Sequence, residues 1–239
     1  MRLKTTSKYF FSDMKYPVLI FYLSITFLTV LFSASTDDGN SSFNGTEMMS
    51  AIFLFIVGLN SFKKNYLFLL SNGVPRRTQF KSFFLAAIPV TVGMAIIDRA
   101  LGAIFNRLIN FNFLFDMIYQ DKTQSTGNII ISLLWSITLY MGAITLGYFI
   151  TLAYYRMNKI QKIIVSIGVP VFFTMVLPYI TYNFCSTATV NWVYNGINTM
   201  LGVTGSFGPI SAVAVFLACT ILLSVLSYLL IRKAPVKDT

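Results

Sequence analysis

Residues 123–162 read TQSTGNIIISLLWSITLYMGAITLGYFITLAYYRMNKIQK, and this stretch decides the kind of protein that the chain forms. Its first thirty-three residues carry no charge, and a basic cluster of Arg156, Lys159 and Lys162 follows them directly. A helix needs about 20 apolar residues to cross a hydrocarbon core about 30 Å thick. The stretch therefore predicts one membrane-spanning helix with a polar start and a positively charged end.

The same alternation of uncharged and basic stretches continues through the rest of the chain. Charged residues make up 11% of the sequence and hydrophobic residues 56%, whereas soluble domains carry about 25% charged residues. The other long uncharged stretches are residues 16–36, 48–62, 82–97 and 163–231. This composition excludes an ordinary soluble globule and predicts an all-α polytopic membrane protein.

The last uncharged stretch is too long for one span and has to be divided. We expect Thr181-Tyr182-Asn183 to end one span, bent by Pro170 and Pro178, because proline removes a backbone donor and clashes with the preceding turn. Pro209 suits the first residue of the last span. The residues between these spans predict irregular backbone, partly re-entrant into the membrane: Asn191, Asn195, Gly196, Gly202, Gly205 and Gly208.

Six spans result, in a single transmembrane domain over residues 1–239 with no nucleotide-binding domain. We expect them at about residues 17–36, 46–62, 82–105, 127–155, 160–182 and 209–231. Before them, residues 1–16 resemble an interfacial helix, with a flexible charged tail as the alternative. Its apolar side chains would enter the lipid boundary: Phe10, Phe11, Met14 and Tyr16. Signal-peptide cleavage after Ser33-Ala34-Ser35 would instead leave five spans.

Basic residues indicate the side of the membrane on which each connection lies. Fifteen of the eighteen Lys and Arg residues form four clusters: Arg2, Lys4, Lys8, Lys15; Lys63, Lys64, Arg76, Arg77, Lys81; Arg156, Lys159, Lys162; Arg232, Lys233, Lys237. With two acids these clusters carry +13, whereas three bases and six acids elsewhere carry −3. Because cytoplasmic connections are rich in Lys and Arg, we expect both termini in the cytoplasm. The composition, rich in Lys, Asn, Ile and Phe, is typical of a bacterial protein, so we expect it in a bacterial plasma membrane. The net charge gives no indication of nucleic-acid binding.

The connection between the second and third spans is longer and more apolar than a simple loop requires. It reads KKNYLFLLSNGVPRRTQFK over residues 63–81. An apolar piece precedes a turn at Asn72-Gly73, and Pro75 suits the first turn of the next helix. That helix would project Arg76, Arg77 and Phe80. A short basic helix on the cytoplasmic side suits docking to a partner, and pairing of the arginines with lipid phosphates is the alternative.

Part of this connection carries a family resemblance. The segment LLSNGVPRRT resembles the connection between spans two and three of ABC-2-type export permeases, the membrane subunits of ATP-driven exporters. Its residues are Leu69, Leu70, Ser71, Asn72, Gly73, Val74, Pro75, Arg76, Arg77 and Thr78. In that family the segment contains a coupling helix that docks in a groove of the ATP-binding subunit. The six spans, the amphipathic start and the partly re-entrant segment are similar as well, and Pro75 stands where Ser is more usual.

The resemblance implies partners and a substrate class. Residues 70–78 with Phe80 would dock on an ATP-binding cassette subunit, which would hold ATP and Mg, because the chain has no G-x-x-x-x-G-K-[ST] loop. A second permease copy, identical or a sibling, would complete the assembly. The nearest similarity is to permeases that export phenol-soluble modulins and related amphipathic peptides. With 23 Phe and 13 Tyr but few charges in the spans, a hydrophobic or amphipathic peptide or lipid-like substrate is expected.

Two charges fall within the third expected span. Asp98 and Arg99 lie about 24 Å of helix rise beyond Ser82, toward its outer edge. Intramembrane charges are candidate functional residues, although this depth favours extension of both side chains to the outer interface. Neighbours on a helix point in different directions, so the two are not expected to pair.

Aromatic and small residues predict further contacts. Five aromatic residues suit an outer interfacial anchor, with a gate on the substrate path as the alternative: Phe105, Phe111, Phe113, Phe115 and Tyr119. Ala143 and Gly147, four residues apart, allow a close helix contact.

Other function classes fit the sequence less well. An enzyme is disfavoured because the chain has no histidine and no cluster of acids within the spans. An ion-coupled carrier usually has acids at mid-membrane and internal repeats, and neither is evident. A scaffold or immunity-type partner of an exporter would have the same sequence features and remains an alternative.

Overall fold

The computed structural model of the chain describes residues 2–35, 42–106, 110–119, 128–204 and 208–232. These residues are almost entirely helical. Six helical segments are long and apolar enough to cross a membrane: Leu3–Leu31, Thr46–Ser71, Arg76–Phe105, Ile129–Arg156, Lys159–Asn183 and Pro209–Arg232. The prediction of an all-α chain with six potential spans is therefore confirmed.

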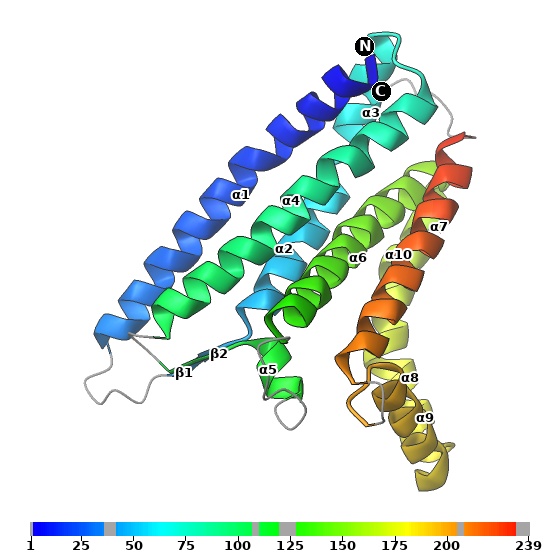
Figure 1. Cartoon of the computed structure of the whole chain (residues 1–239). Coiled ribbons are helices and arrows are strands. Elements are labelled where there is room, and N and C mark those ends of the chain that lie inside the picture. Colours follow the sequence, from blue (N-terminus) through cyan, green and yellow to red (C-terminus); the bar gives the residue numbers. More distant parts are fainter. Residues whose placement is uncertain (1, 36–41, 107–109, 120–127, 205–207, 233–239) are drawn as a thin grey trace.

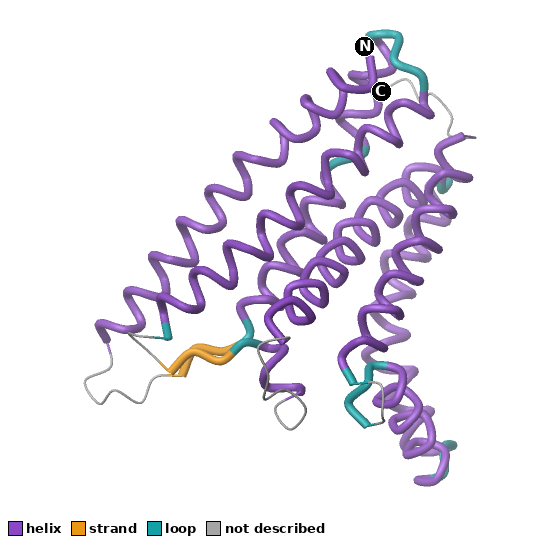
Figure 2. Tube along the Cα trace, in the orientation of Figure 1, coloured by secondary structure: helices purple, strands orange, loops and turns teal. Residues whose placement is uncertain are grey.

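Five long helices form an extended bundle (Figure 1). They are α1 (Arg2–Ser35), α2 (Thr46–Asn60), α4 (Arg76–Phe105), α6 (Asn128–Arg156) and α10 (Pro209–Arg232). α6 packs against α2, α4 and α10, and α1 packs against α4. The helix α3 (Lys63–Ser71) follows α2, and α5 (Leu114–Tyr119) lies between α4 and α6 in the sequence. Two short strands, β1 (Ser42–Asn44) and β2 (Asn110–Asn112), pair in parallel near the far end of α1 (Figure 2).

The basic clusters meet at one end of this bundle. The start of α1, α3, the start of α4, the junction after α6 and the end of α10 all lie there (Figure 1). We call it the basic end; it carries the described Lys and Arg residues of all four clusters. Of the four described acids, Asp13 lies on the basic half of α1, and Glu47, Asp98 and Asp116 belong to the opposite half. The fold thus separates charge along the bundle as the sequence pattern predicts.

The start of the chain is not a separate interfacial helix. α1 runs without a break from Arg2 through Pro17 to Ser35. Phe10 and Met14 are buried, and the Phe10 ring lies 5.9 Å from that of Phe83 on α4. The expected insertion of these two side chains into lipid is wrong, because α4 already begins at Arg76 and gives them a protein surface. Phe11 and Tyr16 are exposed, as a lipid contact requires.

Two glycines bring α2 and α6 into backbone contact. A Cβ atom on Gly147 would lie 2.2 Å from the carbonyl oxygen of Phe55, and one on Gly58 would lie 2.2 Å from that of Ile144. The Thr151 hydroxyl also donates to the Leu59 carbonyl at 2.7 Å. The close contact predicted at Gly147 is confirmed, whereas Ala143 lines a groove between α6 and α10.

The fifth potential span is interrupted and lies at the edge of the bundle, where the Ser166 hydroxyl is 3.2 Å from that of Tyr154 on α6. It consists of α7 (Lys159–Val171), a π-helical turn η2 (Phe172–Val176) and α8 (Leu177–Asn183), and no residue in it is buried. The π-helical turn follows Pro170, where the sequence predicts a disturbance. The predicted end at Asn183 is confirmed.

The connection to the last span contains more helix than expected. α9 (Thr187–Met200) passes through Asn191, Asn195 and Gly196, so the prediction of irregular backbone at these residues is wrong. Ser186 supplies the N-cap, its hydroxyl accepting the Ala188 N–H at 3.4 Å. Gly202 and Gly208 have φ angles of +70° and +56° and do form turns, while Gly205 lies outside the described residues. Pro209 begins α10, as predicted.

The α2–α6 contact gives a stability prediction. Gly147→Ala forces a methyl group into the α2 backbone and should lower the free energy of unfolding by about 1–3 kcal/mol. Gly142→Ala on the same helix is the control, since its Cβ would lie 3.5 Å from the Thr220 hydroxyl, an ordinary contact. Thermal unfolding in detergent should show a lower Tm for the first variant only. Equal Tm values for the two variants would contradict the contact.

Candidate functional site

A tight turn at the basic end joins α3 to α4. Gly73 has φ +69°, a left-handed conformation that other residues seldom adopt. Its N–H donates to the Leu70 carbonyl at 3.0 Å, and the Val74 N–H donates to the Leu69 carbonyl at 2.9 Å. These two bonds form a Schellman motif, which satisfies the last carbonyls of α3 and reverses the chain. The turn predicted at Asn72-Gly73 is confirmed.

The next helix starts one residue later than the sequence suggests. Pro75 is the N-cap of α4, with φ −65° and ψ 145°, and Arg76 is the first helical residue. The Pro75 carbonyl accepts the N–H groups of Thr78 and Gln79 at 2.9 and 3.1 Å. The buried Gln79 amide donates to the Val74 carbonyl at 3.0 Å. These bonds hold the turn in one conformation.

Two arginines and an aromatic residue lie next to this turn. Arg76 donates through Nη1 to the Arg232 carbonyl at the end of α10, at 3.2 Å, whereas the Arg77 side chain is exposed. Phe80 does not project outward as predicted. It is half-buried, with its ring 4.8 Å from Phe84 and 5.4 Å from Tyr228 of α10. Phe80 therefore fixes α4 to α10, and Arg77 is the arginine left open to a partner.

The charge at this corner is unbalanced. A cavity of about 290 Å³ is lined by Pro75, Arg76, Arg77, Tyr228, Ile231 and Arg232. The first turn of α4 contains no acid, and neither Arg76 nor Arg77 forms an ion pair among the described residues. Cations at a helix N-terminus are unfavourable because that end of the helix dipole is positive. An external anionic group would therefore be stabilising here.

α3 is also connected to α1. The Tyr9 hydroxyl donates to the Asn65 side-chain oxygen at 3.1 Å, and the Asn65 amide donates to Asp13 at 2.8 Å. The Phe68 ring stacks on Tyr9, with ring centroids 5.4 Å apart. These contacts attach α3 to the first half of α1.

The charged residues predicted in the third span lie far from this corner and do not extend to an interface. Asp98 is 5% exposed and accepts hydrogen bonds from the Tyr22 hydroxyl at 2.8 Å and from the Tyr140 hydroxyl. Because two hydroxyls replace water around the carboxylate, it can be buried within the bundle. The expected extension of Asp98 to the interface is wrong. Asp98 instead ties α1 and α6 to α4.

Arg99 points away from Asp98, as predicted, and has partners of its own. Its guanidinium lies 4.0 Å from Glu47, 3.7 Å from Asp116 and within hydrogen-bond reach of the Ser132 hydroxyl. It also lies over the Phe113 ring, 4.0 Å from the centroid. Arg99 thus packs against Phe113, the residue before α5, and does not extend into the outer membrane interface.

Glu47 is the residue that sequence reasoning missed. It is 1% exposed and accepts the Leu114 backbone N–H at the start of α5. Its position in the first turn of the second span, at the same end of the bundle as Asp98 and Arg99 of the third, is a signal that could have suggested this contact. Glu47 and Arg99 together attach α5 to the ends of α2 and α4.

The aromatic residues around α5 are packed inside the protein. Phe105, Phe115 and Tyr119 are buried, and the Phe115 ring lies 5.9 Å from that of Trp135. The Tyr119 hydroxyl donates to the Leu201 carbonyl at 2.6 Å, and burial raises the pKa of this hydroxyl. The expected interfacial anchor is wrong for these three residues. The Phe111 side chain lies outside the described residues.

The cluster around Asp98 has no room for a substrate. A cavity of about 10 Å³ lies beside Tyr22, Thr46 and Asp98, enough for about one water molecule. We therefore assign a structural role to the buried charges and regard the α3–α4 corner as the candidate functional site. Comparison of the chain with protein families, curated proteins and solved structures gives no match.

The buried ion pair gives a second prediction. Arg99→Gln leaves the Glu47 carboxylate without its cation, and removing one partner of a buried pair costs about 3–5 kcal/mol of stability. Asp116→Asn is the control, because the Asp116 side chain is 49% exposed and exposed pairs contribute at most about 1 kcal/mol. The double variant Arg99→Gln with Glu47→Gln should regain part of the loss. Unfolding titrations that rank Asp116→Asn as equally damaging would contradict this role.

Proposed function

We propose that this protein is the membrane-spanning permease subunit of an ATP-driven ABC exporter. The observation that carries the proposal is the α3–α4 corner, an exposed basic turn held in one conformation and tied to α1 and α10. Movement of a soluble partner bound at such a corner would be transmitted to several spans through these contacts. It coincides with the segment that resembles the coupling region of ABC-2-type permeases.

Charge distribution supports a cytoplasmic position for this corner. The described Lys and Arg residues of all four clusters belong to the same end of the bundle, and Lys and Arg are enriched on the cytoplasmic side of membrane proteins. We therefore place the basic end, and with it both termini, in the cytoplasm of a bacterial cell. The protein would be a multi-pass protein of the plasma membrane.

The partner at the corner would be an ATP-binding cassette subunit. The sequence contains no phosphate-binding loop, so ATP and Mg would be bound by that subunit. Its surface should be acidic where it meets Arg77, because Arg77 and Arg76 have no acidic partner among the described residues of this chain.

A second permease copy would complete the pathway. The fifth span exposes apolar side chains along its length, and a groove of about 620 Å³ lies between α6 and α10. Residues lining the groove include Leu139, Leu146, Phe216 and Leu222, and none is charged. These apolar surfaces suit contact with another copy and a hydrophobic or amphipathic substrate, either a peptide or a lipid-like molecule.

Buried carboxylates favour one other candidate, an ion-coupled carrier, since such residues often mark ion pathways. Asp98 and Glu47 are both buried. Two tyrosines bind Asp98, Arg99 lies beside Glu47, and the adjacent cavity is too small for a hydrated ion. The exporter is therefore the better supported function.

Affinity purification followed by mass spectrometry tests the proposed partner. An ATPase with a phosphate-binding loop should accompany the unaltered protein. Arg77→Glu should lower its recovery about tenfold or more, because like charges facing each other across an interface cost several kcal/mol. Lys159→Glu, a charge reversal at another exposed residue of the basic end, is the control. Arg76 is avoided because its side chain contacts α10.

Two results would contradict the proposed function. The first is purification of the unaltered protein with no ATPase. The second is equal recovery of the ATPase with Arg77→Glu and Lys159→Glu.

A further inference from the structure

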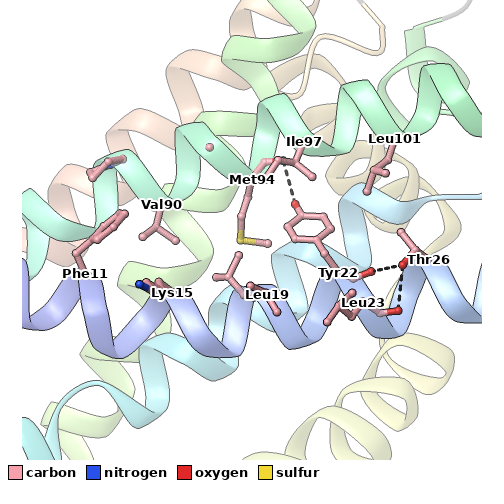
Figure 3. A pocket seen from close by; sticks show the side chains of 13 residues that line it. Phe11, Lys15, Leu19, Tyr22, Leu23, Thr26, Val90, Met94, Ile97 and Leu101 are labelled. Atoms are coloured by element: carbon pink, nitrogen blue, oxygen red, sulfur yellow. Dashed lines mark hydrogen bonds between the residues drawn. The ribbon is translucent and has the colours of Figure 1, made fainter.

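A long apolar groove runs between α1 and α4 on the surface of the bundle (Figure 3). Its volume is about 460 Å³, within the range of about 300–1,000 Å³ typical of small-molecule sites. On α1 it extends from Phe11 and Lys15 to Thr26, and on α4 from Pro89 to Leu101. Apart from Lys15 at one end, no charged side chain lines it.

The groove is open because a side chain is missing from one wall. A Cβ atom on Gly93 of α4 would meet nothing within 4 Å. Beneath it, Val90 and Met94 are buried and form a packed floor. The Tyr22 hydroxyl donates to the Met94 carbonyl at 3.0 Å and to Asp98, so its polar atom is satisfied and its ring adds to the apolar wall (Figure 3).

From Lys15 inward, the groove has about the depth of one leaflet. Thr26 lies eleven positions after Lys15, a rise of about 16 Å along α1, and Phe11 lines the groove one turn further toward the basic end. Half of a hydrocarbon core is about 15 Å. Lys15 lies toward the basic end, so the groove reaches from that membrane surface to about the middle of the bilayer.

A row of lysine side chains on α1 extends from the groove toward the basic end. Lys4, Lys8 and Lys15 follow each other at intervals of four and seven residues, which places them on one side of α1 with Phe11. All three are exposed, and none forms an ion pair among the described residues. Lys15 instead lies over the Tyr16 ring, 5.1 Å from the centroid. The apolar groove thus ends at a stripe of unpaired positive charge.

We propose that this groove binds one acyl chain of an anionic phospholipid from the leaflet at the basic end, with the lipid phosphate at Lys15. The apolar walls match the chain, the depth matches one leaflet, and the lysine stripe matches the headgroup. A second copy is a poorer occupant. In a two-fold symmetric contact each lysine stripe would face the same stripe of its partner and repel it.

The lipid would act on the helix that contacts the docking corner. α1 carries Lys15 in the groove and, six residues earlier, Tyr9, whose hydroxyl donates to Asn65 of α3. A bound chain would hold α1 against α4 and so steady this contact. The lipid site depends only on insertion of the helices in a bilayer, and its test is separate from that of the exporter.

Native mass spectrometry measures the bound lipid directly. The whole protein is reconstituted with equal amounts of phosphatidylglycerol and phosphatidylcholine and released in mild detergent. The unaltered protein should retain one phosphatidylglycerol. Gly93→Leu fills the groove and should remove this adduct. The matched control is Gly168→Leu on α7, where a Cβ would also meet nothing within 4 Å, and this variant should keep it.

Charge at the groove mouth is tested separately. Lys15→Gln should lower the preference for phosphatidylglycerol over phosphatidylcholine about fivefold, the effect of one lysine at an anionic surface. Lys159→Gln, at an exposed lysine of the same end, should leave it unchanged. Unaltered thermal unfolding of Gly93→Leu in lipid-free detergent verifies that this variant is folded.

Three outcomes would overturn the proposal. One is an equal number of retained lipids in Gly93→Leu and Gly168→Leu. Another is equal retention of both lipids by the unaltered protein. The third is a loss of dimer without a change of lipid in Gly93→Leu, which would assign the groove to a second copy.

Discussion

A bilayer leaves a charged side chain two stable positions: beyond the hydrocarbon, or against a partner inside the bundle. Nearly every feature of this chain follows from that constraint. The described residues of the basic clusters lie at one end of the helices. Of the described charges in the other half, Asp98 is bound by two tyrosines, while Glu47 and the half-exposed Asp116 lie against Arg99. The apolar surface between the two ends faces lipid or another protein.

The sequence predicts the potential spans well because the apolar length that a span requires lies within one continuous stretch of chain. Uncharged length and the positions of Pro209 and Gly73 identify helix ends without knowledge of any neighbour. Contacts between helices were predicted less well. Phe10, Met14 and Phe115 were predicted to lie at the membrane interface. The sequence alone cannot distinguish an apolar side chain surrounded by lipid from one surrounded by protein. The pairing of Glu47 with Arg99 depends on α2 meeting α4, and a single sequence does not contain that distance.

The candidate docking corner was found in the sequence, but the division of roles within it was not. Arg76 and Arg77 are neighbours of the same type, yet one bonds the end of α10 and the other is exposed. Successive side chains on a helix point in different directions, so the two arginines cannot share one partner. Only the position of α10 decides which of them is bonded to it. The connections from Asn65 to Tyr9 and from Phe80 to Tyr228 then link this corner to both sides of the bundle. Such links are what a coupling segment needs.

The orientation of the bundle is the claim on which the proposed exporter and its ATPase both depend. Labelling of an introduced cysteine in intact cells with a membrane-impermeant thiol reagent tests it, in a background with Cys185 and Cys219 replaced by serine. Ser71→Cys, exposed at the docking corner, should react only after the membrane is permeabilised. Asn112→Cys, exposed at the opposite end, should react in intact cells. Labelling of Ser71→Cys from outside intact cells would contradict the account.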